Sequence, residues 1–145
     1  MNQKLKIIIR KAVEKDIKHV VELSKGLCQL ENYPHQKLGA SEFKKFLRGN
    51  YTFMFVAEAQ KKVVGYITGF RSDDYFFLPF AAVYKKYRRR GIAKLLLEKV
   101  EEMAKKEKMK YILYTAYTSN KAIEKFSKVM GYKKSRTLIQ YFKIL

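Results

Sequence analysis

The segment best suited to chemistry is residues 83–94, where an apolar run gives way to a basic turn and then to an amphipathic helix. The turn holds the densest basic run of the chain, Lys85-Lys86-Tyr87-Arg88-Arg89-Arg90, and Gly91-Ile92-Ala93 follows it. A helix N-terminus exposes unpaired backbone N–H groups and carries partial positive charge, so it binds phosphate without any side chain. Gly91 and Ala93 leave room for a ligand beside the backbone, and the arginines add charge-assisted hydrogen bonds. These features predict a pyrophosphate ligand.

Other kinds of site find little support in the sequence. The turn lacks the Gly-Lys-Ser/Thr ending of a P-loop and the three-glycine fingerprint of dinucleotide-binding folds. One cysteine, Cys28, with His19 and His35 besides, does not supply the ligands of a structural zinc site, so no metal is expected. No apolar run approaches the ~20 residues that span a bilayer. The sequence therefore predicts a cytoplasmic protein that does not insert into membranes.

The charge of the chain is strongly positive. Its 145 residues include 32 Lys and Arg against 13 Asp and Glu, a formal net charge of +19. Such a charge attracts polyanions, so weak nucleic-acid affinity is one interpretation. The other interpretation is a lysine-rich surface that solvent simply hydrates, because the lysines are spread along the whole chain.

The hydrophobic pattern predicts one domain, residues 1–145, of mixed α/β (α+β) class. Helical spacing or a capping residue indicates helices over residues 14–30, from Ser41 to about Gly49, over 91–106, and over 120–130 with Gly131 as the stop. Apolar, β-branched runs predict strands over residues 4–10, 51–58, 63–70, 75–83 and 111–116, with a final strand pair over 132–145.

Two blocks of this pattern resemble the GNAT family of N-acetyltransferases. The family's hallmark is a valine, four residues, then Arg/Gln-x-x-Gly-x-Gly/Ala, which Val83, Arg88, Gly91 and Ala93 match. The second block is a strand, an asparagine and a helix that ends in Gly-Phe/Tyr, here Asn120 and Gly131-Tyr132. The resemblance covers almost the whole chain. It implies a mixed central sheet of about six to seven strands flanked by about four helices.

The resemblance further implies an enzyme that transfers an acetyl group from acetyl-CoA to a primary amine by direct attack. The cofactor's pyrophosphate would lie on Arg88, Arg89, Arg90, Gly91, Ile92, Ala93 and Lys94, mostly on their backbone N–H groups. The pantetheine arm would pair with the strand end at Ala81, Ala82 and Val83, with Asn120 and Phe126 also at the cofactor. An N–H near Val83 would stabilise the oxyanion of the thioester carbonyl.

The catalytic acid departs from the family pattern. The family often carries a tyrosine four residues before the Gly-Phe/Tyr pair, and this chain has Ser127 there. A serine hydroxyl is a poor acid, so Ser127 would pass a proton through water, or another group such as Tyr117 would serve. Candidate bases are His35, Glu31 and Asp73.

The acceptor is open to several interpretations. By resemblance, residues 31–38 wall the acceptor site, where Glu31 and Tyr33 would hold a cationic amine by charge and cation–π contact. A small-molecule amine, a peptide N-terminus and a protein lysine all fit the sequence. Two alternatives keep other functions open: a basic nucleic-acid-binding module, and a CoA-binding protein without catalysis. Homodimers are common in the family, and the sequence itself does not indicate one.

Overall fold

The computed structural model describes residues 4–25 and 38–145. It contains two compact units, Met1–Thr115 and Ala116–Leu145. In the described parts of the chain, no helix is long and apolar enough to cross a membrane. Within those same parts, His, Cys, Asp and Glu do not form a group of three or more that could hold a metal ion.

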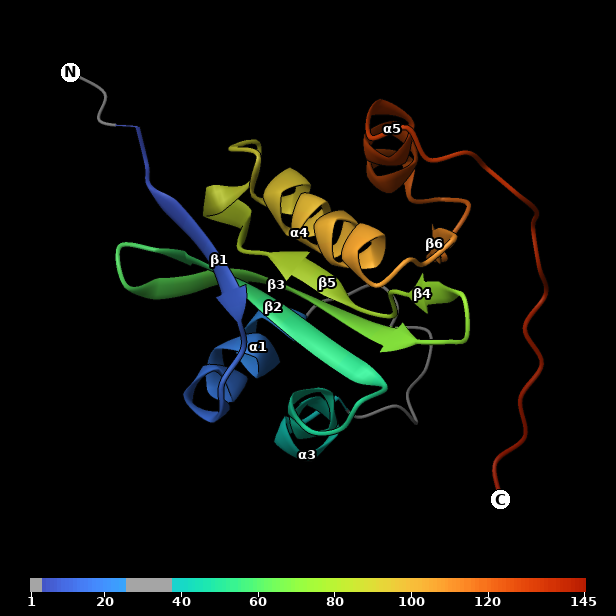
Figure 1. Cartoon of the computed structure of the whole chain (residues 1–145), viewed down its shortest axis with the longest axis horizontal. Coiled ribbons are helices and arrows are strands. Elements are labelled where there is room, and N and C mark those ends of the chain that lie inside the picture. Colours follow the sequence, from blue (N-terminus) through green and yellow to red (C-terminus); the bar gives the residue numbers. More distant parts are fainter. Residues whose placement is uncertain (1–3, 26–37) are drawn as a thin grey trace. The chain divides into compact units, whose positions relative to one another are not determined.

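The first unit is built on a six-stranded sheet (Figure 1). The strands are β1 (Ile7–Lys11), β2 (Thr52–Ala59), β3 (Lys62–Arg71), β4 (Tyr75–Phe77), β5 (Ala81–Val83) and β6 (Tyr111–Leu113). The order is β1-β2-β3-β4-β6, and β5 also pairs with β3. All of these pairs are antiparallel except β4 with β6. The expected mixed fold is confirmed.

Helices cover both faces of the sheet because its central strands are apolar on both faces (Figure 1). On one face lie α1 (Ile17–Ser24) and α3 (Ala40–Lys44), with the short 3-10 turns η1 (Glu14–Asp16) and η2 (Lys45–Leu47). A core that includes Val20, Phe43, Val56 and Tyr66 fills the space between them and the sheet. The other face carries α4 (Ile92–Lys106), whose buried stripe includes Leu96 and Val100.

The first predicted helix is shorter in the structure than the pattern suggested. Residues 14–16 form the 3-10 turn η1, and α1 ends at Ser24 because Lys25 adopts an extended conformation, just before a glycine in the sequence. The rest of the expected helix, residues 26–30, lies outside the described residues.

The predicted long strand over residues 75–83 is two strands, β4 and β5. Pro79 between them has no N–H to donate to a ladder. The register with β3 also shifts there by one residue, since Phe70 pairs with Phe77 whereas Ile67 pairs with Ala81. Thr68 bridges the break, because its hydroxyl contacts both the N–H and the carbonyl of Phe80.

The second unit contains α5 (Lys121–Val129). The helix that the sequence predicts there is confirmed, with Asn120 as its N-cap. The predicted strand pair over residues 132–145 is wrong, because no strand forms there. These residues contain no Gly, Pro, Asn or Asp to make a hairpin turn, and an isolated two-stranded hairpin is marginal in water.

In the first unit, the strand predicted over residues 111–116 is shorter than expected, because β6 ends at Leu113.

Candidate functional site

The strand β5 has one free edge. Its bonds to β3 include Tyr84 N–H to Val64 O and Thr68 N–H to Phe80 O, each 2.9 Å long. Because a strand's backbone groups alternate in direction, the N–H groups of Ala81 and Val83 point to the other side. In the described structure no strand pairs with that side. An extended ligand can therefore bond to β5 as a strand would.

The free edge begins where two parallel strands separate. β4 pairs with β6 from Tyr75 to Phe77, and one more bond follows, from Leu78 N–H to Leu113 O over 3.0 Å. Beyond that point β5 continues along β3, whereas β6 ends at Leu113. Asp73, one of the sequence-predicted bases, precedes β4 and so lies at the opposite end of that strand.

The turn after β5 presents a run of free backbone donors at the start of α4. It consists of the 3-10 turn η3 (Lys85–Tyr87) and then Arg88 to Gly91. Arg89 and Gly91 have positive φ values of 62° and 78°, a backbone geometry that forms anion-binding nests. The first helical bond is Leu95 N–H to Gly91 O, 3.0 Å long. Among the described residues, none accepts a hydrogen bond from the N–H groups of residues 89–94.

Small residues keep these donors accessible. A Cβ on Gly91 would meet nothing within 4 Å, so its positive φ, rather than crowding, explains the glycine. Ala93 is exposed, whereas Ile92 is buried and anchors the helix start on the sheet. A Cβ on Gly65 of β3 would lie 3.3 Å from Ile92 Cγ2, so this glycine permits the close packing.

The arginine side chains of the turn are exposed, and none of them pairs with a carboxylate of the described residues. Arg88 Nε donates to Val83 O over 3.1 Å, which holds its guanidinium at the end of β5. The Arg90 guanidinium lies 5.8 Å from the ring centroid of Tyr87, a cation–π contact. The turn therefore combines free N–H donors with unpaired cations, which suits a pyrophosphate.

The remaining predicted residues that the structure describes lie in the second unit. Asn120 Oδ1 accepts from Ile123 N–H over 3.1 Å, so its side-chain oxygen caps α5. Ser127 Oγ donates to Ile123 O over 2.7 Å, so its proton is engaged with the helix backbone. Phe126 and Tyr117 are half-buried. Glu31, Tyr33, Cys28 and His35 lie outside the described residues.

Comparison with known protein families shows which family this chain belongs to. The sequence model of the Acetyltransferase (GNAT) family matches residues 12–132 of the chain. This protein belongs to the GNAT family. The match spans both the turn from Arg88 to Ala93 and the helix after Asn120, so the resemblance noted in the sequence is confirmed. GNAT enzymes use acetyl-CoA, so the cofactor expectation is confirmed for the family.

Solved structures share the GNAT fold at low sequence identity. The aminoglycoside N-acetyltransferase AAC(6')-Iy, in complex with CoA, has a TM-score of 0.80 and 17% identity over 99% of this chain and 98% of that chain. An aminoglycoside acetyltransferase from an uncultured soil metagenomic sample, in complex with sisomicin, has a TM-score of 0.75 and 17% identity, covering 96% of each chain. A transcriptional regulator from Bacillus halodurans C-125 has a TM-score of 0.81 and 18% identity over 95% of this chain and 100% of that chain.

Two features of this GNAT site escaped the sequence analysis. One is the role of Gly65, although a glycine inside a strand pattern often marks a close approach of two backbones. The other is the separation of the parallel strands after the bond between Leu78 and Leu113. It depends on which strand pairs with which, and local periodicity carries no such information.

Proposed function

We propose that this protein is an N-acetyltransferase that transfers the acetyl group of acetyl-CoA to a primary amine by direct attack in a ternary complex. The observation that carries the proposal is a pair of free donor sets among the described residues. One lies on the edge of β5 at Ala81 and Val83, and the other consists of the backbone N–H groups of residues 89–94. Together the two sets match an elongated ligand with an amide-containing arm and a pyrophosphate.

In this proposal the chain binds the cofactor mainly through its backbone. The N–H groups of residues 89–94 hold the pyrophosphate, and Arg88 adds charge from its place beside Val83. The pantetheine arm lies along β5, where the small side chains of Ala81 and Ala82 leave space. Asn120 donates its side-chain amide to the arm, and Phe126 packs near it, as the family resemblance implies.

The bound cofactor supplies an activated acetyl thioester. In this proposal Val83 N–H would donate to the carbonyl oxygen, where negative charge develops during attack. The free edge holds the arm in one direction, so that most of the acceleration comes from alignment of the two reactants.

Proton transfer is assigned to hydroxyl groups of the second unit. An alkyl ammonium with a pKa of about 10.4 must lose a proton before it attacks, and the leaving thiolate must gain one. Ser127 already donates its proton to Ile123 O. To serve the leaving thiolate, the hydroxyl would have to turn away from Ile123 O, give its proton to the sulfur and take another from water, so we propose Ser127 as a relay rather than as the acid itself. Tyr117 is the alternative acid.

For the acceptor we propose a small-molecule amine. AAC(6')-Iy has been solved with a bisubstrate analogue, CoA-S-monomethyl-acetylneamine, which supports this class. The net charge of +19 repels polycations at long range, so an amine of low charge is favoured over an aminoglycoside. Glu31 and Tyr33 are proposed to hold the ammonium group. The cytoplasmic location stays a prediction.

A thermal-shift titration with acetyl-CoA, with ATP as a polyanion control, tests the proposal first. A ligand at 100 times its Kd adds about 2.7 kcal/mol of stability. We expect a shift with acetyl-CoA, little with ATP, and thiol release with at least one compound of an amine panel. A shift without any turnover would favour CoA binding without catalysis. Equal shifts with both ligands would mean that the turn binds polyanions without preference for acetyl-CoA, and would overturn the proposal.

A matched pair of variants locates the binding. Ala93→Glu places a carboxylate in the first turn of α4, where it favours the helix but repels a pyrophosphate. Ala122→Glu makes the same change at the equivalent position of α5, which is also exposed. We expect Ala93→Glu to abolish the acetyl-CoA shift and Ala122→Glu to retain it. Loss in both variants would contradict the assigned site.

A further inference from the structure

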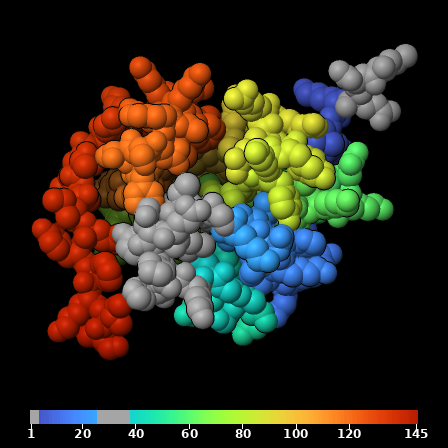
Figure 2. All heavy atoms as spheres, turned by 180° about the vertical axis from the view of Figure 1, so that it is seen from behind, coloured from blue at the N-terminus to red at the C-terminus, as the bar shows by residue number. Residues whose placement is uncertain are grey.

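Six lysines gather at one end of the sheet, and two of them, Lys85 and Lys86, belong to η3, which precedes the free N–H groups of residues 89–94. We call them the lysine end: Lys4, Lys6, Lys61, Lys62, Lys85 and Lys86. Ile7 pairs with Ala59, so the residues before β1 lie beside the turn between β2 and β3. Gly65 pairs with Val83, so η3 lies beside the start of β3. Figures 1 and 2 show these blue, green and yellow segments at the same end.

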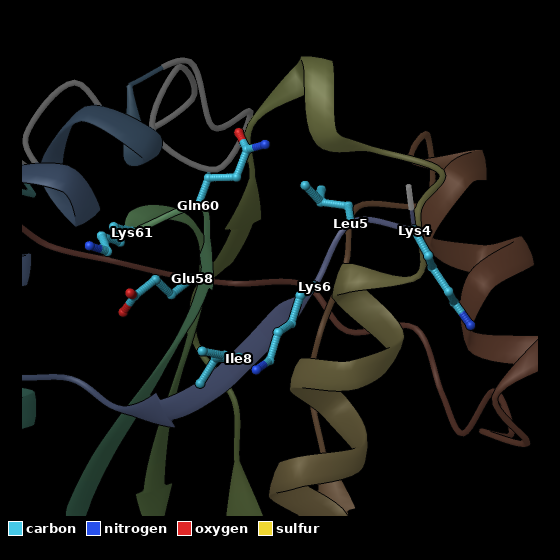
Figure 3. A pocket seen from close by; sticks show the side chains of 7 residues that line it. All are labelled: Lys4, Leu5, Lys6, Ile8, Glu58, Gln60 and Lys61. Carbon is cyan, nitrogen blue, oxygen red and sulfur yellow. The ribbon is translucent and has the colours of Figure 1, made fainter. Parts of the chain in front are cut away.

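All six side chains are exposed, and none forms an ion pair within the described residues. The acidic residue among them is Glu58, whose Oε2 lies 2.8 Å from Arg10 Nε; Arg10 is shared with Asp16, so Glu58 offsets part of the charge of the six lysines. Between the first residues and the turn lies a shallow hollow of about 370 Å³. In Figure 3, Lys4 and Lys6 extend from the β1 side of this hollow, and Lys61 stands on the turn opposite.

Acidic residues are segregated from this end. Between Ala59 and Leu97 the sequence contains two of them, Asp73 and Asp74. Both precede β4 and therefore lie beyond the far end of β3. Six lysines against one partly paired glutamate leave a positive field at the lysine end, and it adds to the field of the whole chain.

We propose that the lysine end binds the phosphodiester backbone of a nucleic acid, without sequence preference, beside the cofactor turn. The strands β1, β2, β3 and β5 span about 14 Å at about 4.8 Å each, a width that covers several phosphates of one strand. Lysine ammonium groups are compact point charges that contact phosphate oxygens without reading bases. A lipid surface would favour apolar side chains that insert, and most of the strongly exposed ones lie in residues 129–145 instead.

The test compares two variants of equal net charge in the full chain. Lys4, Lys6, Lys61 and Lys62 are replaced by Gln in one variant, which leaves residues 85–94 intact. The control replaces Lys18, Lys45, Lys105 and Lys106, which are exposed on other elements and have no ion pair. Fluorescence anisotropy measures binding of a labelled single strand of roughly 20 nucleotides and of its duplex, over a series of salt concentrations.

We expect the first variant to bind at least about tenfold more weakly at about 100 mM salt. For the single strand, the slope of log Kobs against log salt concentration should be smaller in magnitude by about 2 to 3. The control should stay close to wild type, and saturating acetyl-CoA should not displace the oligonucleotide. Comparison of the single strand with the duplex shows which backbone geometry the lysine end fits better. A selective loss of binding in the first variant, for the single strand or for the duplex, supports the proposal. Equal losses in both variants, or displacement of the oligonucleotide by acetyl-CoA, would each overturn it.

Discussion

The Nε atom of Arg88 donates a hydrogen bond to the backbone oxygen of Val83, 3.1 Å away. This contact ties the turn before α4 back to the last residue of β5. Among the described residues, the terminal nitrogens of the guanidinium have no hydrogen-bond partner, and they lie where the backbone donors of residues 89–94 begin. The proposed arm-binding strand and the proposed pyrophosphate site are therefore joined through one side chain.

The first prediction concerns this link. Arg88→Ala removes a charge-assisted donor next to the proposed pyrophosphate and should weaken acetyl-CoA binding about tenfold. The melting temperature without ligand should hardly change, because the side chain is exposed. Calorimetric titration measures the affinity, and Arg136→Ala is the control, since Arg136 is also exposed and carries the same charge. An equal effect of both substitutions would mean that only net charge matters.

A second prediction follows from the packing under the start of α4. A Cβ on Gly65 would lie 3.2 Å from Ala82 O and 3.3 Å from both Ile92 Cγ2 and Val83 Cγ2. Gly65→Ala should cost about 1 kcal/mol of stability and displace the helix start from β5. Acetyl-CoA affinity should fall further than for Arg88→Ala at a temperature where the variant is fully folded. Unchanged affinity in the folded variant would show that the spacing of β5 and α4 is not critical.

The elements around the site were predictable where local chemistry alone determines them. The link of residues 59–62 between two β-branched runs predicted the hairpin, and the hairpin forms with Gln60 and Lys61 at its turn. The amphipathic stripe predicted α4 within a residue of its start, because Gly91 and the basic turn end the preceding strand. The sequence predicted Asn120 as the N-cap of a helix, and it caps α5 in the structure.

Pairing between distant segments was not predictable in this way. Pro79 is a local sign of a break in residues 75–83, but the shift of register along β3 at Thr68 and the end of β6 at Leu113 depend on pairing between distant segments. The apolar residues at the C-terminus read as strands because the pattern does not tell whether a partner strand exists. The free edge of β5, on which the site depends, is the same kind of long-range fact.

A third prediction concerns acid stability. Asp16 is buried, and burial raises the pKa of its carboxyl. Hydrogen bonds from Arg10 and from Val13 N–H outweigh this effect and hold the pKa below the ordinary aspartate value. A lowered pKa in the folded state contributes stability above about pH 3.9, and this stability is lost as the pH falls through the folded value.

Asp16→Asn should therefore cost about 2 kcal/mol at pH 7, below the range for fully buried pairs because Arg10 is partly exposed. The difference from wild type should shrink as the pH falls below about 3.9, where the unfolded carboxyl takes up its proton, and should vanish only below the lowered folded pKa. Urea unfolding over a pH series measures it. Glu14→Gln is the control, because its pairs with Lys44 and Arg48 are exposed and worth little. A difference that persists at low pH would assign the loss to packing instead of charge.

The last prediction concerns alkaline stability. Tyr66 is fully buried, and its hydroxyl lies 2.6 Å from Ser24 Oγ, which donates its own proton to Val20 O. Tyr66 is therefore the donor of the shared bond. Burial raises the pKa of Tyr66 above the ordinary tyrosine value. The unfolded chain thus releases this proton at lower pH than the folded one, and stability falls as the pH rises above about 10.

Tyr66→Phe should cost about 1 kcal/mol near neutral pH through loss of the bond. Above about pH 10 the variant should lose stability less steeply than wild type, by about 1.4 kcal/mol per pH unit, because it has no phenol to ionise on unfolding. Denaturant unfolding between pH 8 and pH 11 tests this slope, with Tyr51→Phe as the control at a phenol that is 76% exposed. Parallel curves for wild type and Tyr66→Phe would show that Tyr66 ionises equally in both states.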